Sequence, residues 1–121
     1  LNINTIKGDI FDLNIKNRFN IATLNKVLEH VYDPVKMLTK TVNLIQNEGL
    51  IYIEVPDGEV AAYHGKNREE FFIEHHHVFS LSSLILMSKS AGLSPLKIER
   101  IKEPSGKFTI IAFLKKMTSN E

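Results

Sequence analysis

The fold is decided by residues 19–56, which read FNIATLNKVLEHVYDPVKMLTKTVNLIQNEGLIYIEVP. Two apolar segments in this stretch, 19–24 and 50–55, lack strict alternation, which is typical of strands covered on both faces. Between them, Asp33 and Pro34 indicate a helix start, with an N-cap carboxylate followed by proline at the first helical position. The apolar positions expected on its inner side are Val35, Leu38, Val42 and Ile45, and Gly49 is expected to end it. Strand, helix and strand in this order predict a βαβ unit with parallel strands and a right-handed crossover.

Upstream of this unit the sequence predicts one further strand. Asn2 to Lys7 is short and partly β-branched, and Gly8 and Asp9 close it with turn residues. Downstream of the unit, Pro56 breaks the second strand, and residues 57–70 are polar and loop-like.

The last third of the chain predicts a helix and a hairpin. Ser80 is suited to cap a helix, and Gly92 to stop it. The positions expected to face inward are Leu81, Leu84, Ile85 and Ala91. Residues 96–101 and 107–114 read as two strands, and the short connection between them makes the pair antiparallel. The whole pattern predicts a single α/β domain over residues 1–121, parallel at first with an antiparallel finish.

Composition limits the classes of function. The net charge is +1 and the basic residues are scattered, whereas a nucleic-acid surface needs a basic stripe, so we expect no nucleic-acid partner. The absence of cysteine excludes disulfides, thiolate metal sites and thiol nucleophiles. The apolar runs are too short to span a membrane, and no signal peptide is visible, so we expect no membrane association and a cytoplasmic location.

Several short motifs follow one another along the chain. They are Gly8-Asp9, Arg18-Phe19-Asn20-Ile21, Val27-Leu28-Glu29-His30-Val31-Tyr32-Asp33-Pro34, Asn47-Glu48-Gly49-Leu50, Glu54-Val55-Pro56, residues 74–84 (EHHHVFSLSSL) and Ala91-Gly92-Leu93. Each is weak alone, but their order and spacing resemble the class I S-adenosylmethionine-dependent methyltransferase family, in a branch that acts on small molecules. The resemblance runs from about Ile6 to Leu114.

The departures from this family are as informative as the matches. The family grips its cofactor with a glycine-rich loop, which lets the backbone approach the ligand, and no G-x-G occurs here. The chain also lacks an initial methionine. We therefore expect the C-terminal part of a Rossmann-like methyltransferase domain, carrying family strands 3, 4, 5, 6 and 7. Because strands 1 and 2 belong between 3 and 4, the apolar strand near Phe19–Leu24 would form an open edge. Either the missing segment exists in the native protein and covers this edge, or residues 2–7, a homodimer partner or another polypeptide covers it.

The resemblance implies S-adenosyl-L-methionine as cofactor and a small molecule as methyl acceptor. An acceptor oxygen, nitrogen or carbanion would attack the sulfonium methyl in line, so that positioning supplies most of the catalysis. A base is needed only where the acceptor must lose a proton. The alternative interpretation is a truncated, non-catalytic methyltransferase-like module that acts as an interaction or accessory subunit.

Five residues are candidates for binding the cofactor. By resemblance, Asp9 would accept a hydrogen bond from the adenine amino group, and Ile10 and Phe11 would pack beside the adenine ring. Asn25 and Lys26 end a strand at its carboxyl edge, where open α/β sheets bind ligands. The alternative for Asp9 is a turn-forming role, and that for Ile10 and Phe11 is ordinary packing in the core. The alternative for Asn25 and Lys26 is a solvated loop.

Three histidines are candidates for acting on the acceptor. His30 could serve as a base, since histidine exchanges a proton near neutral pH. Because Glu29 and His30 are adjacent, we expect them to point in different directions on a helical turn. His75 and His77 share one face of an extended segment, and either could touch the acceptor. Aromatic and imidazole side chains that would line the acceptor side, or pack beneath a loop, are Tyr63, His64, Phe71 and Phe72.

The three consecutive histidines also raise the question of a metal site. A half-site of His75 and His77, completed by His30, His64 or Glu74, is geometrically conceivable. The family segment already accounts for this spacing, however, so the sequence predicts no metal.

Overall fold

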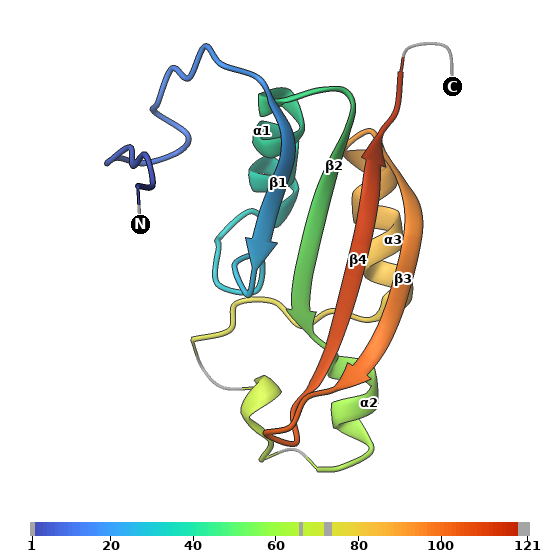
Figure 1. Cartoon of the computed structure of the whole chain (residues 1–121). Helices are drawn as coiled ribbons and strands as arrows, with labels where there is room; N and C mark the ends of the chain where they lie inside the picture. Colours follow the sequence, from blue (N-terminus) through green and yellow to red (C-terminus); the bar gives the residue numbers. More distant parts are fainter. Residues whose placement is uncertain (1, 66, 72–73, 119–121) are drawn as a thin grey trace.

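Four strands form one mixed sheet in the order β1-β2-β4-β3 (Figure 1). The computed structural model describes residues 2–65, 67–71 and 74–118. The strands are β1 (Phe19–Asn25), β2 (Ile45–Pro56), β3 (Leu93–Lys102) and β4 (Phe108–Lys116). β1 and β2 are parallel, whereas β4 is antiparallel to both β2 and β3. The predicted parallel pair and antiparallel finish are therefore confirmed.

The helix of the βαβ unit is α1 (Pro34–Leu44). It begins as predicted, with Asp33 Oδ1 accepting a hydrogen bond from Lys36 N at 3.0 Å. Leu38, Val42 and Ile45 are buried, but Val35 in the first turn is 43% exposed, so its predicted inward position is wrong. Thr41 is buried instead, because its hydroxyl donates to the carbonyl of Met37 at 2.9 Å and so needs no water.

The helix does not end at Gly49, as the sequence predicts, but at Leu44, directly before β2. Gly49 lies inside β2, where the pairing with β1 shifts register between Phe19 and Ile21. A Cβ on Gly49 would lie 2.8 Å from the carbonyl oxygen of Gln46 and 3.1 Å from that of Asn20. Glycine is needed there for the close approach of two backbones, and not for a helix stop.

Residues 2–18 contain no strand, so the predicted strand from Asn2 to Lys7 is wrong. Its two apolar side chains, Ile3 and Ile6, are both largely exposed. Without burial or a neighbouring strand, the backbone gains nothing from an extended pairing. In the described part of the chain β1 pairs with β2 alone, and Ile21 on it is 61% exposed. The predicted apolar edge is therefore present.

The second half contains more helix than expected. The segment predicted as a loop carries α2 (Gly58–Ala62) and a 3-10 turn, η1 (Glu69–Phe71). Asp57 starts α2, because its Oδ1 accepts a hydrogen bond from Val60 N at 3.2 Å. The predicted helix α3 (Leu81–Ser90) is confirmed, with a reciprocal capping box between Ser80 and Ser83.

The hydrophobic core lies between the sheet and the two longer helices. α1 and α3 both lie behind the sheet in Figure 1, and they contact one another. Leu84 and Ala91 are buried as predicted, Leu81 and Ile85 only partly, and Met87 is buried in addition. The opposite face of the sheet carries partly exposed side chains such as Tyr52 and Phe113, whose rings lie 4.9 Å apart. None of the helices in the described ranges has the length and apolarity that crossing a membrane requires.

Candidate active site

A cavity of about 200 Å³ opens at the carboxyl end of the parallel strand pair. Lys26 directly follows β1 and Pro56 ends β2, so both strands lead into it. Open α/β sheets bind their ligands at this edge. The described residues that line the cavity are Lys26, Glu29, His30, Pro56, Glu70, Glu74, His75, Lys107 and Phe108.

Two segments far apart in the sequence are hydrogen-bonded to one another at this cavity. The carbonyl of Glu29 accepts hydrogen bonds from the backbone N–H groups of His76 and His77, at 2.7 and 3.2 Å. His30 Nδ1 lies 3.0 Å from the carbonyl oxygen of Glu74, and His77 Nε2 lies 3.1 Å from that of Tyr32. These four contacts join the turn after β1 to the histidine segment.

His30 and His75 meet in the cavity. Their rings are arranged edge to face, with centroids 4.8 Å apart. His75 Nδ1 lies 2.9 Å from the carbonyl oxygen of Glu70. A carbonyl oxygen only accepts, so the Nδ1 atoms of both rings carry the hydrogen and donate it. The Nε2 atom of each neutral imidazole is then left with its lone pair.

His77 is placed differently from these two histidines. Its Nε2 is already bonded to Tyr32, and His77 is not among the described residues that line the cavity. The structure therefore brings together two of the three candidate catalytic histidines, His30 and His75, and leaves the third outside.

Glu29 is the cavity residue that sequence reasoning misjudged. Its side chain is 1% exposed, and Oε1 lies 3.7 Å from His30 Nε2. The expectation that Glu29 and His30 point apart is wrong, because residues 28–30 form a single turn and not a helix. The turn is closed by a hydrogen bond of 3.0 Å from His30 N to the carbonyl of Val27. Glu29 Oε2 is buried and has no hydrogen-bond partner in the described part of the chain.

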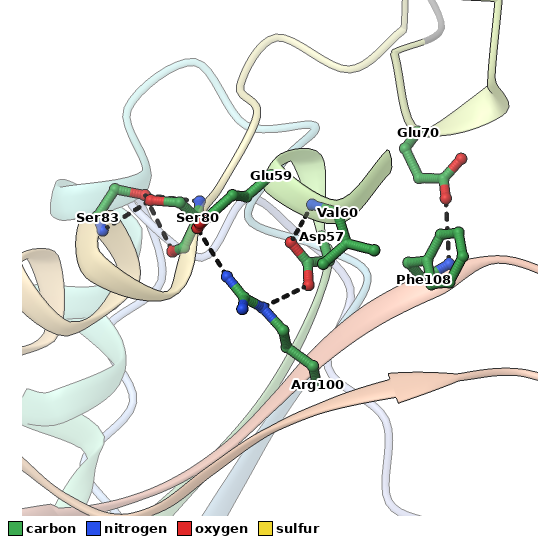
Figure 2. A network of polar contacts seen from close by, with 8 residues as sticks. All are labelled: Asp57, Glu59, Val60, Glu70, Ser80, Ser83, Arg100 and Phe108. Atoms are coloured by element: carbon green, nitrogen blue, oxygen red, sulfur yellow. Dashed lines mark hydrogen bonds and ion pairs between the residues drawn. The ribbon is translucent and has the colours of Figure 1, made fainter. Parts of the chain in front are cut away.

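Glu70 ties the 3-10 turn to the β3–β4 hairpin. Its carboxylate accepts hydrogen bonds from Arg68 Nε, Arg68 Nη2 and Phe108 N, each at 3.1 Å, the last of which is seen in Figure 2. Burial by itself would raise the pKa of Glu70, but these hydrogen bonds outweigh it and hold the pKa below its usual value. A charged Glu70 thus anchors the backbone whose carbonyl orients His75.

A second carboxylate, Asp57, lies buried at the end of β2 (Figure 2). Besides capping α2, Asp57 forms an ion pair with Arg100, in which Oδ2 lies 3.1 Å from Nε. Arg100 Nη2 also lies 2.7 Å from Glu59 Oε2. This cluster holds α2 against β3, and it is structural because it does not line the cavity in the described part of the chain.

Lys26 leads the chain out of β1 in a left-handed conformation, with φ of 56°. Its backbone N–H donates to the carbonyl of Glu54 at 2.9 Å. The ammonium donates to the hydroxyl of Thr109 at 2.6 Å and lies 3.7 Å from Glu103 Oε1. The side chain, which lines the cavity, therefore bridges from the end of β1 to β4 and the hairpin loop.

The remaining candidates for cofactor binding lie in two places. Asn25 is exposed at the carboxyl end of β1, as predicted. Asp9 lies in a turn of its own, where its Oδ1 accepts a hydrogen bond from Phe11 N at 2.9 Å. Ile10 and Phe11 are half-buried, and the ammonium of Lys36 lies 4.8 Å from the centre of the Phe11 ring. The turn thus packs beside α1, and the geometry of Asp9 fits the turn-forming alternative as well as a ligand contact.

The aromatic candidates for the acceptor side also separate. His64 stacks on Phe108, a cavity residue, with ring centroids 4.7 Å apart. Tyr63 is exposed and Phe71 is half-buried, while Phe72 lies outside the described residues. Glu70, Lys107 and Phe108 line the cavity although no sequence pattern marks them, since a loop and a hairpin bring them there.

Comparison with known proteins identifies the family. A family model described as a methyltransferase domain matches residues 2–98 of the chain. No curated protein matches it. The fold is shared with 1,6-didemethyltoxoflavin-N1-methyltransferase from Burkholderia thailandensis, solved with 1,6-didemethyltoxoflavin and S-adenosylhomocysteine, at a TM-score of 0.74 and 18% identity over 93% of this chain and 50% of that one.

Two further solved structures share the fold. The N-methyltransferase NodS from Bradyrhizobium japonicum, in complex with S-adenosylhomocysteine, superimposes with a TM-score of 0.65 and 12% identity, over 90% of this chain and 52% of that one. A S-adenosylmethionine-dependent methyltransferase from Clostridium acetobutylicum does so with a TM-score of 0.70 and 13% identity, over 93% and 64%. The chain thus spans about half to two thirds of the length of these structures. With a family model that covers most of its residues, the chain belongs to the methyltransferase-domain family.

Proposed function

We propose that this chain supplies the acceptor-side part of a methyltransferase that transfers a methyl group from S-adenosyl-L-methionine to a small molecule. The observation that carries the proposal is the cavity at the carboxyl end of the parallel strands, in a chain of the methyltransferase-domain family. An acceptor held there attacks the sulfonium methyl, and S-adenosylhomocysteine leaves. Where the acceptor carries a proton, His30 Nε2 or His75 Nε2 takes it, because each ring uses its Nδ1 to contact a backbone carbonyl.

The strand order supports a specific assignment within the family. In the family order 3-2-1-4-5-7-6, we assign β1, β2, β3 and β4 to strands 4, 5, 6 and 7. The observed order β1-β2-β4-β3 then corresponds to 4-5-7-6 without rearrangement. This assignment places Asn25 and Lys26 at the end of strand 4, beside the position that the cofactor occupies in the family.

The cofactor residues are part of the same proposal. Asn25 and the backbone of Lys26 would hold the methionine end, and the turn of Asp9, Ile10 and Phe11 would contact the adenine. The three residues of that turn lie outside the sheet, and the sequence contains no G-x-G. Tight cofactor binding by these 121 residues would therefore need support that the glycine loop gives in other members.

A second function is favoured by the open edge of β1. An accessory module would use this edge, with Phe19 and Ile21 exposed on it, to add a strand from a second copy or from another polypeptide. Under this alternative the cavity carries no chemistry of its own.

Isothermal titration of the chain with S-adenosyl-L-methionine separates the two. Saturable heat that is weakened at least about tenfold in an Asn25→Ala variant supports cofactor binding at the end of β1. The matched control is Asn43→Ala, at the far end of α1, which should bind as the unchanged chain does. No heat at millimolar ligand would exclude autonomous cofactor binding and favour the accessory module.

A further inference from the structure

We propose that Glu29, His30 and His75 form a binding site for a divalent cation of the Zn²⁺ type, with its fourth position open to the cavity. One donor atom from each residue lies within 4.8 Å of the other two. Two imidazole nitrogens and one carboxylate are a donor set that zinc accepts, and three protein ligands with an open position are typical of catalytic zinc. The sequence predicted no metal, because the family segment already accounts for the histidine spacing, and Glu29 was not among the ligands considered.

The hydrogen bonds of the two histidines suit metal binding. A metal-binding imidazole almost always donates its other ring N–H to a carbonyl or carboxylate, which fixes the tautomer and the ring orientation. Both rings do this here, with Nδ1 of His30 on the carbonyl of Glu74 at 3.0 Å and Nδ1 of His75 on that of Glu70 at 2.9 Å. The Nε2 atoms are left to bind a cation.

Glu29 gives an independent indication of a missing partner. Its side chain is 99% buried, since only 1% is exposed, yet Oε2 has no hydrogen-bond partner in the described part of the chain. An unpartnered buried carboxylate oxygen costs stability, and a cation beside it would remove that cost. The neighbouring Oε1 is already 3.7 Å from His30 Nε2.

The distances are close to those of a loaded site. With zinc–ligand bonds near 2.1 Å in a tetrahedron, donor atoms lie about 3.4 Å apart. The Glu29–His30 pair would need to close by about 0.3 Å, and donor atoms at the widest separation of 4.8 Å by about 1.4 Å.

The charges around the site leave room for a cation. Lys26 lines the same cavity, but its ammonium bonds Thr109 and lies beside Glu103. Lys107 also lines the cavity and contributes a positive charge, and Glu74 contributes a negative one, while the charge of Glu70 is balanced by Arg68. With the cation bound, the two Nε2 lone pairs no longer take a proton. If the proposed function holds, an oxygen of the acceptor would instead occupy the fourth position, where the cation would make it easier to deprotonate.

Zinc binding by the whole chain tests this site without cofactor or acceptor, so its outcome is independent of methyl transfer. Protein made without a polyhistidine tag and stripped of metal with a chelator is titrated calorimetrically with Zn²⁺. We expect one Zn²⁺ per chain, and affinity lowered at least about tenfold in each of Glu29→Gln, His30→Ala and His75→Ala. The matched control is His76→Ala, whose exposed ring is adjacent in sequence and outside the cavity lining.

A second measurement uses only the unchanged chain, so that misfolding of a variant cannot affect its result. Co²⁺ added to the unchanged chain should give the intense visible absorption of four-coordinate nitrogen and oxygen ligation, and Zn²⁺ should displace it. Absence of stoichiometric Zn²⁺ binding would overturn the proposal. So would a His76→Ala variant that loses zinc while His30→Ala and His75→Ala keep it, because the ion would then lie on the exposed histidine.

Discussion

Glu70 should make this protein sensitive to acid, and Glu70→Gln should remove that sensitivity. The carboxylate is buried and accepts three hydrogen bonds, two from Arg68 and one from the backbone of Phe108. These bonds hold its pKa below the usual value of 4.5, against the opposing effect of burial. The folded state therefore takes up the proton of Glu70 less readily than the unfolded chain. The stabilisation is complete above the unfolded pKa and is lost as pH falls through the lower folded value.

The size of the effect follows from these contacts. Glutamine keeps the shape but carries no charge, and its NH₂ group would face a donor. A hydrogen bond to a charged group contributes about 1.5–3 kcal/mol. Arg68 is 26% exposed and can regain some hydration, so we expect a loss near the lower end, about 2 kcal/mol at pH 7.

Urea denaturation followed by circular dichroism measures this loss at a series of pH values. The difference between the unchanged chain and Glu70→Gln should be largest at pH 7 and should shrink as pH falls below about 4.5. Glu99→Gln, whose exposed side chain pairs with Lys97, is the matched control and should cause little change. A difference that is independent of pH, or no difference at pH 7, would refute the reasoning.

Two further predictions concern the helix start and the open face of the sheet. Asp33→Ala should lower the free energy of unfolding, measured by urea denaturation, by about 1 kcal/mol. Asp33→Asn should retain most of this stability, because the amide oxygen can also accept the hydrogen bond from Lys36 N. Equal losses in the two variants would argue against the cap. Burial, the 2.6 Å hydrogen bond to Glu54 and the charge of Glu54 raise the pKa of Tyr52 to about 12. Tyr52→Phe should therefore remove the last step of a phenolate absorbance titration, and an unchanged last step would contradict this assignment. In the unchanged chain the stabilisation by the neutral phenol of Tyr52 should be lost as pH rises from about 10 towards 12.

The βαβ unit could be predicted because its signals are local. Asp33-Pro34 favours a helix start through its own side chain and fixed backbone angle, and continuous apolar segments favour buried strands. The same holds for the capping box of Ser80 and for the antiparallel hairpin. The errors occur where a local signal had no tertiary support. Asn2–Lys7 had β-branched residues but no burial, and Gly49 looked like a helix stop although it accommodates a backbone crossing.

By itself the sequence determined the βαβ unit, the helix α3, the antiparallel hairpin and the family, and it proposed His30, His75 and His77 as site residues, because these depend on spacing and residue chemistry. Only the tertiary structure decided which side chains meet. Glu29 joins the histidines because the turn after β1 is closed by His30 N, and His77 is excluded because Tyr32 holds its ring elsewhere. The contact between His77 and Tyr32 spans 45 residues and that between His30 and Glu74 spans 44, so both depend on chain geometry that no local pattern records.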